Sequence, residues 1–160
     1  MEASLEVLVV SPDVAVATFR NVVLIHFRRE TPLSCIAMLR AAMNTVPEGQ
    51  KAIFFAVIET TSVPPNQEVR AAFAKFFEDH SARLACAIIT IRGVGFRAAM
   101  VRTIASSVLT LLPRFRVPFP KHIGGSLEEA AAHANALAPQ LSPAALLGAF
   151  RALSEMVPKS

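Results

Sequence analysis

The stretch Lys51–Glu59, KAIFFAVIE, decides how the rest of this sequence folds. It places an uninterrupted apolar run, Ala52 to Ile58, between two charged residues. A run of this length is typical of a strand buried on both faces, as in a parallel sheet. Parallel strands need long crossover connections, which are usually helices. The stretch therefore predicts an α/β protein with helices on either side of it.

Helical and extended patterns alternate downstream of this strand. Asn66 can cap a helix, and Ser126 and Ser142 can cap two more, the first within a capping box, S-L-E-E, and the second before Pro143. The expected elements are a helix with the core stripe Val69, Ala72, Phe73, Phe76 and Phe77, a strand at 83–91, a loop at 93–95, a helix at 96–112, a short last strand at 115–117, a connection through Ile123–Gly125, an alanine-rich helix at 127–137 and an amphipathic helix from 142.

Three short strands and a helix are expected upstream. Apolar runs at 5–10, 14–19 and 22–27 predict antiparallel strands, with Arg20-Asn21 as a hairpin turn because Asn tolerates positive φ. Thr31 is a good N-cap and Pro32 suits the first helical position, so a helix should begin there and end at Pro47–Gly49.

The order of elements predicts one α/β fold. It has a mixed sheet, antiparallel at the N-terminus and then built of parallel βα units, with four to five helices. A length of 160 residues suits one domain. Residues 1–139 should form that domain. Residues 140–160 should form an appended amphipathic helix that docks on the body or on a partner.

Composition limits the function classes. With 53% hydrophobic and 18% charged residues, the chain is too apolar for disorder. The most apolar segment, 94–112, is interrupted by Arg97 and Arg102, so no membrane span is expected. Cys35 and Cys86 cannot make a disulfide scaffold and are expected to be small core residues. The start of the chain lacks a signal-peptide pattern, and a cytoplasmic protein is expected.

Catalytic and metal-binding patterns are weak in this sequence. The four histidines and two cysteines have no metal-ligand spacing such as HxxxH or CxxC, and G-x-S-x-G is absent. No carboxylate pair can be nominated. We therefore expect no enzyme, no metal and no cofactor.

Basic residues are concentrated in one part of the chain. Between residues 81 and 127 there are seven bases and no acid. Within this part, Gly93 and Gly95 follow a strand and are flanked by Arg92 and Arg97, which is a weak match to an anion-binding loop. The alternatives are a tight turn and a solvated basic face, and both are favoured over an anion site. Nucleic acid is not expected, because the bases are not interleaved with aromatic residues.

The helix at 96–112 is apolar over more than one core stripe. Either neighbouring helices cover it, or it is a subunit interface with a protein partner or a second copy. Its candidate interface residues are Phe96, Met100, Ile104, Val108 and Leu111.

The order of elements over residues 5–138, together with the Gly-Ser-Leu-Glu-Glu-Ala-Ala segment at 125–131, resembles the STAS fold of anti-sigma-factor antagonists. The nearer resemblance is to the SpoIIAA-like (STAS/SEC14-like) relatives. In the antagonists, the strand matching Lys51–Glu59 ends in Asp-Ser-Ser-Gly, and the second Ser is phosphorylated at a helix N-terminus. The resemblance implies that Thr61 is the phosphoacceptor, with Thr60 and Ser62 beside it. This chain departs from the pattern, because the Gly is absent and Pro64-Pro65 lengthen the loop.

Two functions remain after these exclusions. The first is a non-enzymatic regulatory or scaffolding domain that acts by protein–protein interaction, as implied by the resemblance and by the broad apolar helix. The second is a carrier of a small amphipathic anionic or lipid-like ligand, suggested by the apolar excess and by the arginines near Gly93–Gly95.

Overall fold

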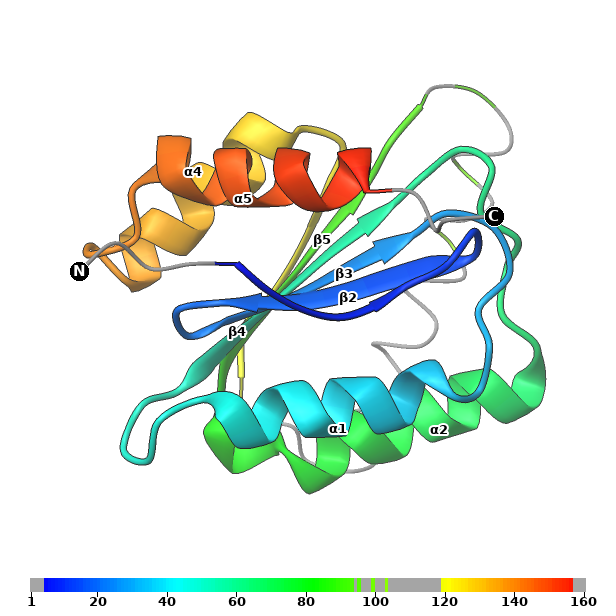
Figure 1. The fold of residues 1–160 in the computed structure, drawn as a ribbon, viewed down its shortest axis with the longest axis horizontal. Coiled ribbons are helices and arrows are strands. Elements are labelled where there is room, and N and C mark those ends of the chain that lie inside the picture. Colours follow the sequence, from blue (N-terminus) through cyan, green and yellow to red (C-terminus); the bar gives the residue numbers. More distant parts are fainter. Residues whose placement is uncertain (1–4, 94, 96–98, 100–102, 104–118, 157–160) are drawn as a thin grey trace.

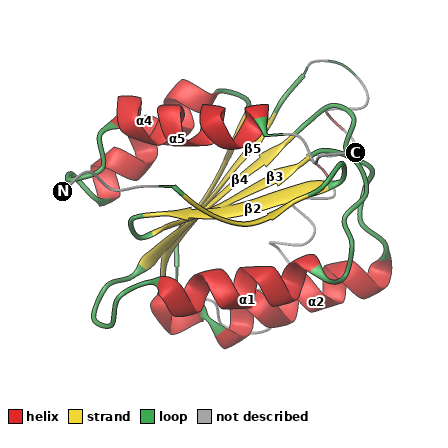
Figure 2. Ribbon diagram, in the orientation of Figure 1, coloured by secondary structure: helices red, strands yellow, loops and turns green. Residues whose placement is uncertain are grey.

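In a computed structural model of the chain, a central sheet lies between two layers of helices (Figure 1). The structure describes residues 5–93, 95, 99, 103 and 119–156. Helices α1 (Cys35–Thr45) and α2 (Gln67–Asp79) cover one face of the sheet. Helices α4 (Leu127–Leu137) and α5 (Pro143–Glu155) cover the other, as Figure 2 also shows. The predicted α/β class with a mixed sheet is confirmed.

The strands lie side by side in their order along the chain, β1 to β6. Strands β1, β2 and β3 pair antiparallel, and β3, β4, β5 and β6 pair parallel. The strands are β1 (Glu6–Val10), β2 (Val14–Phe19), β3 (Val22–Phe27), β4 (Ala52–Ile58), β5 (Leu84–Ile91) and β6 (Lys121–Gly124), with a short 3-10 helix at Ser81–Arg83 before β5. The KAIFFAVIE stretch thus forms β4, a central strand that is buried on both faces as predicted.

The face covered by α1 and α2 is rich in phenylalanine. Phe54 on β4 is 1% exposed, and its ring centroid lies 5.0 Å from that of Phe77 and 6.1 Å from that of Phe76 on α2. The predicted stripe of α2 supplies this contact. Aromatic pairs at such separations add to the energy of burial. This face therefore holds most of the aromatic bulk of the described core; its phenylalanines are Phe27, Phe54, Phe73, Phe76, Phe77 and Phe119.

The face covered by α4 and α5 is packed differently. Helix α4 contacts the sheet through small side chains, Ala130, Ala131 and Ala134. Helix α5 buries larger residues, Leu146, Phe150 and Leu153, against the same face. The residues after 140 are therefore docked on the body of the domain in this structure.

Three helix caps agree with the sequence and one does not. Asn66 accepts a hydrogen bond from the Val69 amide, Ser126 accepts one from the Glu129 amide, and Ser142 accepts one from the Ala145 amide. The predicted start of α1 at Thr31–Pro32 is wrong, because the helix begins at Cys35. A tight turn precedes it, in which the Cys35 amide donates to the Pro32 carbonyl at 3.1 Å.

Two further predictions need correction. The hairpin between β2 and β3 forms as expected, but Arg20 and not Asn21 has the positive φ, 54°. The Asn21 side chain instead donates to the Lys51 carbonyl at 2.9 Å and ties the hairpin to the start of β4. The connection expected at Ile123–Gly125 contains the second half of a strand, because β6 at Lys121–Gly124 pairs with β5.

Some predictions fall outside the described residues. These are the helix at 96–112, with its candidate interface residues Phe96, Met100, Ile104, Val108 and Leu111, and the strand at 115–117. Among the helices of the described ranges, none combines the length and apolar character that a membrane crossing needs.

Candidate functional site

Charged side chains gather where β3, β4 and β5 end. Arg28, Glu59 and Arg92 are the residues that directly follow these three strands. The parallel ladder continues through them, because the Glu59 amide donates to the Phe27 carbonyl and the Arg92 amide to the Ile58 carbonyl, both at 2.9 Å. Side chains alternate between the faces of a strand. The three charged residues therefore project on the same face as His26, the face covered by α5.

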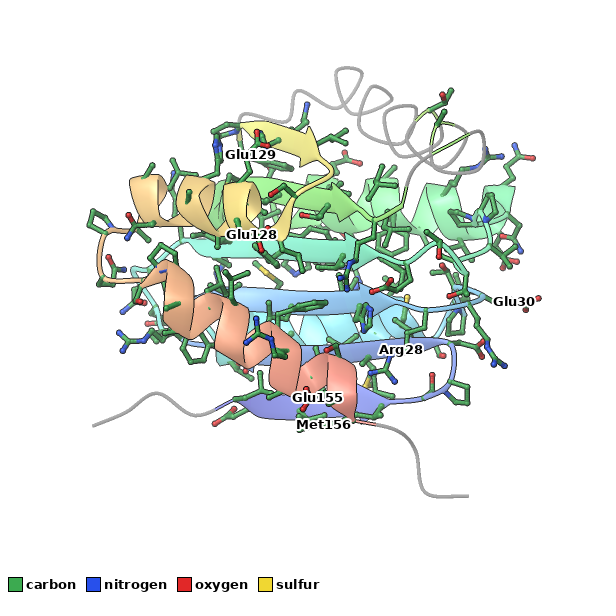
Figure 3. The ribbon with its side chains drawn as sticks, turned by 90° about the horizontal axis from the view of Figure 1, so that it is seen from above. Arg28, Glu30, Glu128, Glu129, Glu155 and Met156 are labelled. Carbon is green, nitrogen blue, oxygen red and sulfur yellow. The ribbon has the colours of Figure 1, made fainter. Side chains whose placement is uncertain are left out.

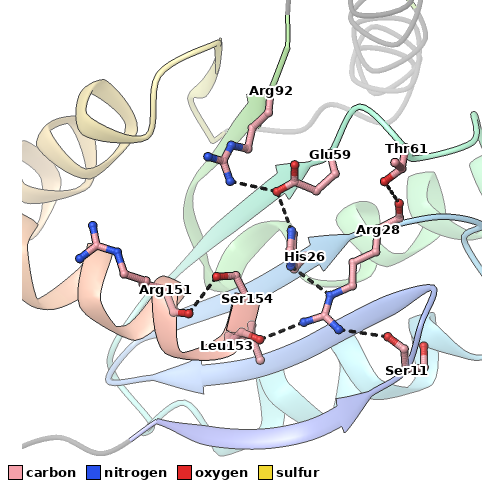
Figure 4. A network of polar contacts seen from close by, with 9 residues as sticks. All are labelled: Ser11, His26, Arg28, Glu59, Thr61, Arg92, Arg151, Leu153 and Ser154. Carbon is pink, nitrogen blue, oxygen red and sulfur yellow. Dashed lines mark hydrogen bonds and ion pairs between the residues drawn. The ribbon is translucent and has the colours of Figure 1, made fainter. Parts of the chain in front are cut away.

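These four side chains form one network (Figure 4). The Glu59 carboxylate accepts from His26 Nε2 at 2.9 Å and from the Arg92 guanidinium at 3.0 Å, both on Oε1. The Arg28 Nε donates to His26 Nδ1 at 3.2 Å. The hydrogen bond from His26, with help from the charge of Arg92 and against the effect of burial, lowers the pKa of Glu59.

The network selects one tautomer for a neutral His26 ring. A guanidinium nitrogen can only donate, so Nδ1 must be the accepting nitrogen. The proton of a neutral imidazole then lies on Nε2 and is donated to Glu59. His26 is only 4% exposed, and its ring packs edge-on against Phe150 of α5 at 5.1 Å between centroids. Both ring nitrogens have partners within the protein.

Arg28 connects the network to two other parts of the molecule. It donates to the Ser11 carbonyl in the turn between β1 and β2 at 3.2 Å, and to the Leu153 carbonyl near the end of α5 at 2.9 Å. A cation at this end of a helix is favoured by the helix dipole. Burial lowers the pKa of Arg28, and the nearby Glu59 charge opposes that shift. Arg28 therefore joins α5 to the strand ends (Figure 4), and in Figure 3 it lies beside the C-terminal end of that helix.

The predicted phosphoacceptors lie in the loop beside this network. Thr60 and Thr61 are exposed, and Ser62 is buried. The Thr61 hydroxyl donates to the Arg28 carbonyl, and the Ser62 hydroxyl donates to the Arg29 carbonyl at 3.3 Å. Helix α2 begins only at Gln67 and is capped by Asn66. Thr61 is thus placed at the strand ends, several residues before the N-terminus of α2.

The backbone conformation after β5 accounts for the glycines at 93 and 95. Gly93 has φ +97° and Gly95 has φ +105°, conformations that favour glycine. A Cβ on Gly93 would also lie 2.1 Å from Cγ2 of Thr60. Arg92, a candidate for anion binding in the less favoured alternative, is paired with Glu59. Arg97 lies outside the described residues.

The sequence did not single out His26, Arg28 or Glu59 as a group. A signal was present, because His26 and Arg28 bracket the end of one strand and Glu59 directly follows the next. Parallel register brings these positions together, but only once β3 and β4 are known to be neighbours.

The two cysteines are not part of this site. Cys35 and Cys86 are free and buried, and burial raises the pKa of each thiol to about 12. Within the described ranges, no group of three or more His, Cys, Asp or Glu side chains is arranged to hold a metal ion.

Fold and site together define a mixed α/β domain whose strand ends carry an internally paired polar network. No family model matches the chain, and no curated protein or solved structure is significantly similar to it.

Proposed function

We propose that this chain is a non-enzymatic regulatory or scaffolding domain of the cytoplasm that acts by binding another protein. The observation that carries the proposal is the pairing of His26. A general base needs a ring nitrogen within reach of a substrate proton. Here Nδ1 accepts from Arg28 and Nε2 donates to Glu59, so both nitrogens stabilise the fold. This supports a structural role for the most base-like group of the site.

The binding surface that we propose surrounds the network at the strand ends. It combines the exposed hydroxyls of Thr60 and Thr61, the half-exposed Arg92 and the exposed apolar side chain of Val63. Protein interfaces use such mixtures of apolar contact and polar groups, with arginine enriched. The resemblance to the STAS family supports the same proposal, because members of that family serve as interaction modules.

Phosphorylation of Thr61 would regulate this surface. A phosphate would replace the hydroxyl that now donates to the Arg28 carbonyl and would add a charge of about −2 beside it. The local backbone contact would be lost, and the phosphate would compete with the Glu59 carboxylate for the Arg92 guanidinium. We expect partner binding to differ between the two forms.

Capture experiments with matched variants test the proposed surface. Val63→Asp with Arg92→Gln alters it, and Lys75→Glu on α2 alters an exposed position of the opposite layer. A protein held by the wild type and by Lys75→Glu, but at least tenfold more weakly by the double variant, is the expected result. Purified components should reproduce the difference in Kd.

Two results would contradict the proposal. Equal binding by the double variant would exclude this surface. A wild-type protein that is monomeric in native mass spectra and retains no partner would argue against an interaction module altogether. A homodimer lost in the double variant would identify the partner as a second copy.

A further inference from the structure

Two buried polar atoms have no hydrogen-bond partner in the part of the chain that the structure describes. They are Oγ1 of Thr90 on β5 and Nε2 of His122 on β6. Thr90 is only 1% exposed. Burying a polar group without a partner costs free energy, so such groups are rare in folded proteins. Neither atom belongs to the network around Glu59.

The two atoms lie on the same small area of the sheet. Thr90 is paired with Gly124, and Ile88 is paired with His122, so Thr90 and His122 are diagonal neighbours across β5 and β6. Nε2 of His122 lies 3.2 Å from the position that a Cβ on Gly124 would occupy. Glycine at 124 therefore leaves room for the His122 imidazole, because a side chain there would crowd Nε2.

The N-terminus of α4 adjoins this area. The chain runs from Gly124 directly into the Ser126 cap, and α4 packs on β5. Free backbone N–H groups and the helix dipole make such a terminus favourable for anions. Arg92 projects on the same face two residues beyond Thr90, and the network of Arg28, Arg92 and Glu59 adds a net positive charge when His26 is neutral.

His122 has two further neighbours on α4. The ring of His133 stacks on it, with centroids 4.5 Å apart and planes inclined by 18°, and this contact fixes the orientation of His122. The Glu129 carboxylate lies 3.7 Å from Nε2, which is too far for a hydrogen bond. Its side chain is 62% exposed and can turn to solvent. The Glu129 carboxylate would therefore compete with a bound anion for the His122 imidazole.

We propose that Thr90, His122 and the N-terminus of α4 form a binding site for a small oxyanion, either free phosphate or the phosphoryl group of a larger ligand. The Thr90 hydroxyl, the His122 Nε2–H and the first amides of α4 supply donors to one anion. This site adjoins the surface proposed for protein binding at Arg92, but it does not depend on that role.

Thermal unfolding with inorganic phosphate tests the site. Phosphate should raise the Tm of the wild type above its value in chloride of equal ionic strength. Thr90→Val keeps the shape and removes the hydroxyl. We expect it to be as stable as the wild type without phosphate, because an unsatisfied group is lost, and to weaken the Kd for phosphate at least tenfold.

Two other variants sharpen the test. Thr18→Val, which alters a buried threonine on β2, should leave the Kd unchanged. Glu129→Gln removes the competing charge and should tighten the Kd severalfold. Glycerol phosphate separates the two sources of the anion, because tighter binding than inorganic phosphate would indicate a phosphoryl group on a larger ligand.

The proposal is overturned if phosphate does not stabilise the wild type relative to chloride. It is equally overturned if Thr90→Val binds phosphate like the wild type, or if Glu129→Gln weakens binding.

Discussion

The two faces of the sheet differ in what fills them. Beneath α1 and α2, the core is a cluster of aromatic rings around Phe54. Beneath α4 and α5, alanines of α4 and larger apolar residues of α5 make the helix contacts, and His26, Thr90 and His122 interrupt the apolar surface. Polar groups in a core are costly unless they are paired, so they are retained where they have a role. The comparison indicates that the α1–α2 face supplies most of the stability, whereas the α4–α5 face holds the polar groups that we propose for binding.

The most severe test of this comparison uses adjacent residues of β4 that point to opposite faces. Phe54 packs under α2, and Phe55 packs under α4 and α5. Phe54→Ala should lower the free energy of unfolding by about 3–5 kcal/mol, the usual range for a buried ring. Phe55→Ala should cost less, because α5 can move to close the cavity. Denaturant unfolding measures both, and a larger loss for Phe55→Ala would reverse the assignment of the faces.

A second test removes the contact that holds α5. Arg28→Met leaves the His26 Nδ1 and the carbonyls of Ser11 and Leu153 without their donor. We expect a loss of about 2–3 kcal/mol, since each unsatisfied buried group costs about 1–3 kcal/mol and these are only partly buried.

Hydrogen exchange distinguishes this loss from a general one. In Arg28→Met, amide protection should fall more in α5 than in α1. Arg151→Met, at an exposed position of α5, is the matched control. It should change neither the free energy of unfolding nor the amide protection of α5. Equal loss of protection in both helices would mean that Arg28 stabilises the whole fold and not the α5 face.

A third test uses the pH dependence of the network. The pKa of Glu59 is lowered from its usual 4.5, so the folded state favours the ionised carboxylate. Its stabilising contribution is complete above about pH 5 and is lost as pH falls through the lowered pKa. Glu59→Gln should cost about 1–2 kcal/mol at neutral pH, the size of a charge-assisted hydrogen bond. The difference from the wild type should shrink in acid.

Glu48→Gln serves as the control for that experiment, because Glu48 is exposed in the loop before β4. Its pH profile should follow the wild type throughout. A difference for Glu59→Gln that stays constant from pH 7 to pH 3 would show that its carboxylate is not held by the network.

Local patterns were sufficient to predict most of the fold. The apolar run of β4, the stripe of α2 and the caps at Asn66 and Ser126 depend on neighbours in sequence, and each was confirmed. The start of α1 was not predictable in this way, because Thr31 and Pro32 suit a helix N-terminus but form a preceding turn. Strand β6 was missed because four residues containing Lys and His have little strand character before they pair with β5.

The candidate site was harder to predict, because it depends on register. His26 and Glu59 are 33 positions apart, and only the parallel pairing of β3 with β4 brings them to 2.9 Å. The contact of Arg28 with Leu153 spans 125 positions. A pattern of neighbouring residues cannot predict contacts between positions so far apart in the sequence. The loop of Thr60–Ser62 was located correctly at the end of β4, since that position follows from the strand alone.

The smallest expected effect is a difference in the rates at which a thiol reagent labels the two cysteines. Each cysteine reports on the opening of one face of the sheet. Cys35 belongs to the α1–α2 face and Cys86 to the α4–α5 face. With a pKa of about 12, each folded thiol is ionised to only about one part in 10⁴ at pH 8, so labelling requires opening. If the α4–α5 face opens first, Cys86 should react faster with a thiol reagent than Cys35, without any change in global stability. Arg28→Met should accelerate Cys86 alone. Faster labelling of Cys35 would show that the aromatic face is the less stable one, and the division of roles between the faces would then fail.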